Sequence, residues 1–392
     1  MDQRTIQILF ALLRSAICGT KLAKEERNNY SPDLLQDLLE IAAKHDVAHL
    51  LAVGLKQNGL IPEGHKDIER HIFNAVYRYE QIKFEYRNLC TALEQAQIPF
   101  LPLKGSVIRK YYPEAWMRTS CDIDVLVHRK DLEYAISYLV SKHNYVENGR
   151  ATHDVSLFTQ NGIHVELHFD LVEEGRAQNA INVLLSVWEN VTVCENSEYW
   201  YEMTDEYLYF YHIAHMAKHF ESGGCGIRPF VDLWILDHMK DADLSARDTL
   251  LRQGGLLKFA NLSRTLCEVW FDGKEADEIA LQMQDFLLRG GVYGSIENRV
   301  TLQKKNRGGR IGYIISRMFI PLEKLTRYYP VLEKHRWLMP VMQIRRWFML
   351  LKPDVARMAK RELEINRKLD KSDADIMNQF LVNIGLQQDE SV

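Results

Sequence analysis

The sequence predicts an α+β fold in which a small mixed or antiparallel sheet with its helices is embedded in N- and C-terminal helical regions. Short apolar segments with strand-like alternation occur only in the middle of the chain, whereas both flanks show helical periodicity. We therefore expect a helical lead-in over 1–97, an α/β core over 98–200, a helical, basic C-terminal domain over 201–371 and a polar tail over 372–392.

The composition is that of an ordinary globular protein. Of the 392 residues, 46% are apolar and 26% are charged, which is enough to bury a sizeable core. The six cysteines contain no CxxC pair, which argues against a zinc site or a disulfide framework and fits a reducing, cytoplasmic compartment. The sequence contains no run of about 18 apolar residues, so no transmembrane segment is expected, and its start does not look like a signal peptide.

Four helices are expected in the lead-in. Apolar residues recur at helical spacing over 1–19, and the Ser31-Pro32 pair is a good start for a second helix. A third helix over 46–57 ends at Asn58-Gly59, and a long apolar periodicity predicts a fourth over 67–96.

The most informative residues are Asp122 and Asp124, which alternate with apolar residues in the stretch Asp122-Ile123-Asp124-Val125-Leu126-Val127. Side chains at i and i+2 share one face of a strand. Two buried like charges are costly unless cations neutralise them, and rigid carboxylate oxygens suit Mg²⁺ together with substrate phosphates. This pattern indicates metal-assisted phosphoryl or nucleotidyl transfer.

A strand and a turn precede the two acids. The stretch from Ile98 reads as a strand that ends at Lys104-Gly105-Ser106, with a helix starting near Ser106. A glycine after a strand lets the backbone approach a ligand, and a helix start offers N–H groups to an anion. Ser106 could cap the helix or bind phosphate, and Lys104 would bring a positive charge to the same place.

A third acid follows in a segment that alternates strictly from Ile163 to Leu171. Asn161-Gly162 is a strong turn signal, so this segment and 155–158 should form a hairpin. Glu166 is the expected third carboxylate, with Asp170 as the competitor, because three carboxylates can hold two divalent ions about 4 Å apart.

Polar residues also gather after the predicted core. A helix over 205–219 carries His215 and His219 at i and i+4, a metal-binding spacing, but no clear third ligand follows, so packing or capping is favoured. A glycine-rich loop then leads to Arg228, which could grip phosphate. Asp232 could orient Arg228 or Lys218; the alternative is a simple connecting loop between two packed helices.

The C-terminal region is strongly basic. Residues 304–368 contain 17 Lys and Arg against 5 Asp and Glu, a net charge of +12, although the whole chain has −4. This asymmetry suggests an anionic partner or a contact between the two halves. The aromatic residues of 310–351 could stack bases or lie on an anionic membrane; packing of an aromatic stripe on the core is the favoured interpretation. The segment from 372 on looks polar and weakly ordered.

In combination, these motifs resemble the polymerase-beta-like nucleotidyltransferase superfamily. More narrowly, Leu103-Lys104-Gly105, Arg118 with Asp122-Ile123-Asp124, and Val165-Glu166-Leu167-His168 are similar to a bacterial, poorly characterised nucleotidyltransferase family. The resemblance implies that the sheet is a nucleotidyltransferase core, that the cofactor is Mg²⁺ or Mn²⁺, and that the donor is an NTP, with ATP expected. It supports Lys218, Arg228 and Asp232 as residues of the nucleotide or acceptor pocket, but it does not imply an acceptor.

The expected function is metal-dependent transfer of NMP from an NTP to a hydroxyl group, with release of pyrophosphate. Asp122, Asp124 and Glu166 would hold the metals, and Gly105 with Ser106 would seat the phosphates. The charge of the transition state would be offset by basic residues, namely Lys104, Arg118, Lys218 or Arg228. Three alternatives remain: a nucleotidyltransferase that modifies a small molecule, one that modifies a protein or neutralises a toxin, and a catalytically silent module that binds nucleotide or RNA.

Overall fold

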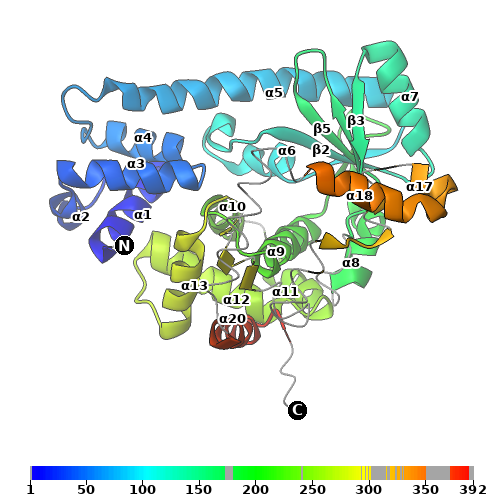
Figure 1. Ribbon diagram of the computed structural model, residues 1–392. Helices are drawn as coiled ribbons and strands as arrows, with labels where there is room; N and C mark the ends of the chain where they lie inside the picture. Colours follow the sequence, from blue (N-terminus) through cyan, green and yellow to red (C-terminus); the bar gives the residue numbers. More distant parts are fainter. Residues whose placement is uncertain are drawn as a thin grey trace. The chain divides into compact units, whose positions relative to one another are not determined.

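The computed structural model describes residues 2–172, 180–239, 242–292, shorter pieces between 294 and 349, and 371–387 (Figure 1). The chain forms two compact units, which we describe separately. The first consists of Met1–Lys218 with Gly226–Val292, and the second consists of His219–Cys225 with Tyr293–Val392.

The N-terminal helices of the first unit match the four that the sequence predicts, with one short helix in addition. Helix α5 is the longest, with 27 residues, and its apolar positions recur at helical spacing. The added helix α2 lacks any buried residue, which explains why it left no periodic signal. The elements are α1 (Gln3–Cys18), α2 (Lys24–Asn29), η1 (Pro32–Leu34), α3 (Leu35–Lys44), α4 (Ala48–Gln57), η2 (Lys66–Ile68) and α5 (Glu69–Gln95).

A five-stranded mixed sheet with the order β1-β2-β5-β4-β3 forms the centre of the first unit. β1 is antiparallel to β2, β2 is parallel to β5, and the remaining pairs are antiparallel. The β4–β5 hairpin turns at Gly162, whose φ of +74° suits glycine, so the predicted hairpin is confirmed. The strands are β1 (Phe100–Pro102), β2 (Asp122–Val127), β3 (Val146–Arg150), β4 (Asp154–Phe158) and β5 (His164–His168).

The sheet uses its two faces differently. Ile123 and Val125 of β2 and Val165 of β5 belong to a hydrophobic core that also contains Leu89 of α5 and Leu139 of α7 (Leu132–His143). Strand side chains alternate, so the opposite face receives the acids. The α+β fold with its small mixed sheet is thereby confirmed.

Strand β3 and the two-stranded sheet of the first unit had no clear sequence signal. Strand β3 is exposed at every position, so it shows no alternation of apolar and polar residues. A second, two-stranded sheet pairs β6 with β7. The further elements are α6 (Gly105–Ile108), η3 (Arg109–Tyr111), η4 (Ala115–Met117), α8 (Ile181–Leu185), η6 (Val187–Glu189), β6 (Val191–Val193), β7 (Tyr201–Met203), α9 (Asp205–Glu221), α10 (Arg228–Asp237), α11 (Leu244–Gln253), α12 (Leu257–Cys267), the π-helical turn η7 (Glu268–Asp272) and α13 (Glu278–Arg289).

In the second unit, the described residues correct two expectations. The segment expected to be weakly ordered from 372 contains α20 (Lys371–Asn383), because Phe380, Leu381 and the following Ile384 are buried. The aromatic side chains of 310–351 do not all pack inward, since Trp337 and Phe348 are exposed. The elements here are α17 (Val331–Lys334), η8 (Arg336–Leu338) and α18 (Met339–Met349).

Much of the basic stretch 304–368 lies outside the described residues, so its expected anionic partner stays a prediction. Among the residues that the structure does describe, no helix combines the length and the apolar character that spanning a membrane requires.

Candidate active site

The carboxylates of β2 stand on the face of the sheet that lies opposite the hydrophobic core. Asp122 and Asp124 alternate with Ile123, which is fully buried in that core. β5 runs parallel to β2 in a register that sets Asp124 opposite Glu166. Because neighbouring strands lie about 4.8 Å apart, this register gathers the three predicted carboxylates at one place.

A lysine and a histidine compensate part of this negative charge. The Lys104 Nζ lies 2.7 Å from Asp124 Oδ1 and 3.9 Å from Glu166 Oε2. The His168 Nε2 lies 2.9 Å from the same Asp124 oxygen and 3.3 Å from Glu166 Oε2. Asp124 is buried, and a buried carboxylate needs such partners to remain ionised.

The two aspartates respond in opposite ways. Burial raises the pKa of Asp122, and the neighbouring Asp124 carboxylate raises it further. Burial acts on Asp124 too, but the Lys104 ammonium and the His168 hydrogen bond outweigh it and hold the pKa of Asp124 well below its usual range. For His168, hydrogen bonds to Asp124 and Glu166 outweigh the effect of burial and raise its pKa. Asp122 is therefore the acid whose negative charge is least compensated.

Two overlapping groups of side chains could hold a metal ion. One is Asp122, His164 and Glu166, the other is Asp124, Glu166 and His168, and the ligand atoms of each group lie within 4.8 Å of one another. Glu166 belongs to both groups, which suits a carboxylate placed between two ions. Carboxylate oxygens are the donors that Mg²⁺ and Mn²⁺ prefer, so the donor set fits either ion.

The turn after β1 directs Lys104 toward the acids. The Leu103 N–H donates to the carbonyl oxygen of Asp124 at 3.0 Å, and Lys104 itself has a positive φ of +49°. The Ser106 N–H donates to the carbonyl oxygen of Leu103 at 3.2 Å. This amide therefore closes the turn. The expected contact of the Ser106 hydroxyl with phosphate remains a prediction.

Gly105 has a packing role in the same turn. A Cβ at Gly105 would lie 3.3 Å from Arg118 Nη1, which is closer than most such contacts. The Gly105 carbonyl accepts a hydrogen bond of 2.7 Å from Arg109 Nε. The close approach that glycine permits here is thus to the Arg118 guanidinium, and a phosphate contact of Gly105 stays a prediction.

A cavity adjoins the acid cluster on the side of α9. Lys104 and His168 line it, together with Tyr211, His215 and Lys218 of α9. Lys218 therefore shares this cavity with Asp170 and with Lys104 and His168, the two side chains that contact Asp124 and Glu166. His215 lines the same cavity but belongs to none of the potential metal groups found among the described residues.

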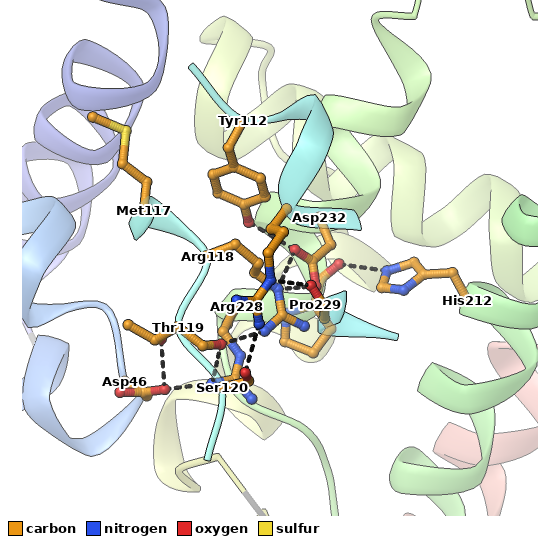
Figure 2. A network of polar contacts seen from close by, with 12 residues as sticks. Asp46, Tyr112, Met117, Arg118, Thr119, Ser120, His212, Arg228, Pro229 and Asp232 are labelled. Carbon is orange, nitrogen blue, oxygen red and sulfur yellow. Dashed lines mark hydrogen bonds and ion pairs between the residues drawn. The ribbon is translucent and has the colours of Figure 1, made fainter. Parts of the chain in front are cut away.

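Arg118 and Asp232 meet in a different, buried network (Figure 2). The Arg118 Nε lies 2.7 Å from Asp232 Oδ1 and 2.9 Å from Oδ2, and the Tyr112 hydroxyl donates to Oδ1 at 2.7 Å. Burial would raise the pKa of Asp232, but the Arg118 charge outweighs it and lowers this pKa. The interpretation that Asp232 orients Arg228 or Lys218 is therefore wrong in one respect: its ion-pair partner is Arg118.

Arg228 belongs to the same network through another acid. Its guanidinium forms an ion pair with Asp46, and its Nη1 donates to the Thr119 carbonyl at 3.3 Å. The Thr119 hydroxyl donates to Asp46 Oδ2 at 2.9 Å (Figure 2). Arg118 and Arg228 thus tie the loop before β2 to α10 and to the connection between α3 and α4.

The sequence reasoning did not assign the histidines of the site. His168 contacts two of the three acids, and His153, Asp154 and His168 form a third potential metal group. The strict alternation of β5 did place His164 and His168 on the face of Glu166, so the signal was present. Asp170, the competitor of Glu166, lies beyond the end of β5, and Arg129 Nη2 is 3.3 Å from its Oδ2.

Comparison with known families identifies one match. The model of an uncharacterised nucleotidyltransferase family matches residues 32–272, which include the N-terminal helices from η1 onward, the sheet and both charged networks. Comparisons with curated proteins and with solved structures gave no match.

Proposed function

The chain belongs to the uncharacterised nucleotidyltransferase family, and we propose that it transfers NMP from an NTP, with ATP as the expected donor, to a hydroxyl acceptor in a reaction that requires Mg²⁺ or Mn²⁺. One observation carries the proposal. Asp122, Asp124 and Glu166 converge on one face of the sheet, with Lys104 and His168 as the cationic partners found beside them. The three carboxylates carry more negative charge than these partners neutralise, which favours the binding of further cations.

The triphosphate would lie in the cavity beside the acids. Lys104 and Lys218 line this cavity from opposite elements, the turn after β1 and helix α9. Ammonium groups bind phosphate as point charges, so both would offset charge on the donor. Arg118, Arg228 and Asp232 contribute indirectly in this proposal, because their contacts hold the loop that leads into β2.

The reaction requires one bond to form and one to break. The acceptor oxygen would attack the α-phosphorus, the bond from the α-phosphorus to the β-phosphate oxygen would break, and pyrophosphate would leave. Metal ions, when bound, would supply charge neutralisation of the triphosphate and would lower the pKa of the acceptor hydroxyl. Glu166, which is partly exposed, would take the proton from the acceptor.

A second candidate function follows from Lys104. Its ammonium already pairs with Asp124 at 2.7 Å, so the acids could be retained around a lysine without a metal. The protein would then bind a nucleotide without transferring it. Metal binding separates the two candidates, because only the enzyme needs carboxylates that accept a divalent ion.

The test combines metal binding with transfer. Calorimetric titration with Mn²⁺ and incubation with α-labelled ATP in cell extract would be compared for wild type, Asp122→Asn and Glu166→Gln. We expect metal-dependent labelling of an acceptor that both variants lose, and the labelled product would distinguish a small molecule from a protein or an RNA. Nucleotide binding with neither metal binding nor labelling would overturn the proposal in favour of the silent module.

A further inference from the structure

Helix α18 of the second unit has two different faces (Figure 1, orange). Its inner face contacts a small core of Leu325, Tyr329 and Leu332, against which Met339 and Met342 pack. This side is also held by polar contacts to one carbonyl. The Met318 carbonyl oxygen accepts hydrogen bonds from side chains of the helix, which are those of Gln343, Arg346 and Trp347.

The outer face is apolar and exposed. Trp337 of η8, which directly precedes α18, is 75% exposed, and Val341, Ile344 and Phe348 of α18 are 54%, 49% and 67% exposed. Their spacing of four, three and four residues puts them on one stripe of a helix. Because the inner face already has its own core, these four side chains do not face the core that orders the helix. Large apolar side chains gathered on one face of a helix mark an interaction surface.

The charged side chains that the structure describes over 334–349 are basic. Lys334, Arg336 and Arg345 are exposed beside it, and Arg345 directly follows Ile344 of the stripe. The sequence from 335 to 349 contains no Asp or Glu. An apolar stripe that includes Trp and Phe, with Arg and Lys at its border, is the pattern of a helix that lies in the plane of an anionic membrane surface.

We infer that the stripe of Trp337, Val341, Ile344 and Phe348 docks this protein on the surface of a membrane that contains anionic lipids. The apolar side chains enter the boundary between headgroups and acyl chains, and the flanking cations attract the lipid phosphates. Each basic residue near such a surface contributes favourable energy, and salt weakens this contribution. This attachment is peripheral and is independent of the acid cluster.

A second exposed aromatic face, on α5, allows the effect of bordering charges to be separated from the effect of apolar exposure. Phe73, Tyr77 and Phe84 of α5 are also exposed and lie on one face of that helix. Their neighbours include the exposed Glu69 and Glu80 as well as arginines, so this face lacks the one-signed border of α18. Phe73 and Phe84 therefore serve as matched control positions.

The test is cosedimentation of the full chain with vesicles of phosphatidylcholine alone or mixed with phosphatidylglycerol. We expect binding to the anionic vesicles that falls as salt rises. The double variant Trp337→Glu/Phe348→Glu should lower the partition coefficient by about tenfold or more, because each buried aromatic side chain contributes on this scale. Arg336→Gln/Arg345→Gln should lower it by roughly tenfold on anionic vesicles.

The control Phe73→Glu/Phe84→Glu should bind the anionic vesicles as wild type does. Circular dichroism of every variant would verify that the helices are retained. Three results would each overturn the inference: no binding of wild type to anionic vesicles, equal loss of binding in the α5 control, and binding of a single-stranded RNA through the same residues without any vesicle binding.

Discussion

The first unit contains two clusters of charge that differ in their balance. The network of Arg118 and Arg228 with Asp232 and Asp46 has two cations and two anions, and each guanidinium is paired with a carboxylate. The acid cluster has three carboxylates, Asp122, Asp124 and Glu166. Lys104 and His168 contact the same two of these acids, Asp124 and Glu166. A second histidine, His164, lies 4.0 Å from Glu166.

This difference separates a structural role from a chemical one. A balanced and buried network stabilises one arrangement of the chain, and it has no charge left for a ligand. A cluster with surplus negative charge costs stability unless a cation joins it. The pKa of Asp122 is raised, whereas Asp124 and Asp232, which have cationic partners, both have lowered pKa values.

The largest expected effect is loss of transfer after removal of an acid charge. Asp122→Asn or Glu166→Gln should lower kcat by roughly a hundredfold to a thousandfold or more, because a fixed electrostatic contribution to the transition state is lost. Steady-state labelling with α-labelled ATP measures this kcat. Asp170→Asn tests the assignment of the third acid, because Asp170 lines the cavity beside the acids and pairs with the exposed Arg129. We expect a smaller loss than for Glu166→Gln; an equal or larger loss would argue against Glu166 as the third acid.

The balanced network should respond through stability. Asp232→Ala leaves the Arg118 charge buried without its carboxylate, so the free energy of unfolding should fall by about 3–5 kcal/mol. Urea denaturation followed by circular dichroism measures this. Arg150→Gln, which removes the exposed pairs with Glu133 and Glu147, should cost less than about 1 kcal/mol. Similar losses for the two variants would remove the distinction between the clusters.

Lys104 tests whether the acid cluster can bind a further cation, because its ammonium already pairs with Asp124. Lys104→Met keeps most of the volume but removes the charge 2.7 Å from Asp124. We expect Mn²⁺ to bind roughly tenfold more tightly, since a competing positive charge is gone, while transfer becomes slower because a phosphate contact is lost. Calorimetry measures the affinity. The matched control is Lys110→Met, which removes a partly exposed lysine paired with Glu202 and should leave the Mn²⁺ affinity unchanged. Weaker Mn²⁺ binding in Lys104→Met would contradict the competition.

The smallest expected effects are those of pH on stability, and they have opposite signs. The folded-state pKa of Asp232 is lowered, so its ion pair contributes stability above the unfolded-state pKa that is lost as pH falls through the lower, folded-state value. The folded-state pKa of Asp122 is raised, so ionisation of Asp122 destabilises the fold as pH rises through the window between the unfolded and folded values.

Two variants make this contrast measurable. Asp122→Asn should be more stable than wild type at neutral pH, and its advantage should vanish as the medium becomes acidic. Asp232→Asn should be less stable at neutral pH, and its deficit should shrink below the usual range of an aspartate. Urea titrations at a series of pH values would give both curves, and a stability deficit of Asp122→Asn at neutral pH would refute the assigned charge surplus.

The sequence predicted the strands and helices whose apolar residues recur regularly. Alternation around Asp122 and Asp124 identified β2, and the Asn161-Gly162 turn identified the β4–β5 hairpin. Strand β3 and helix α2 were not predicted, because their exposed residues carry no such pattern. A periodic apolar pattern arises because one face of an element is buried. Elements that bury few residues therefore cannot be predicted from this pattern.

The site was predictable to the extent that it follows from strand geometry. Alternation put Asp122 and Asp124 on one face and Glu166 on a face of its own strand, but only the pairing of β2 with β5 brings them together. The partners of Arg118 and Arg228 could not be predicted, since Asp232 and Asp46 are far away in the sequence and no local pattern links them. The role of His168 was likewise hidden until its distance to Asp124 was known.

The contact between Gly105 and Arg118 connects the two charge clusters mechanically. Asp232 holds the Arg118 side chain, so the guanidinium cannot easily retreat from an added methyl group, which would lie 3.3 Å from Nη1. The turn would have to move, and with it Lys104, the neighbouring residue. Arg118 therefore limits the position of Lys104 beside the acids to within a few tenths of an ångström, although its own ion-pair partner is Asp232.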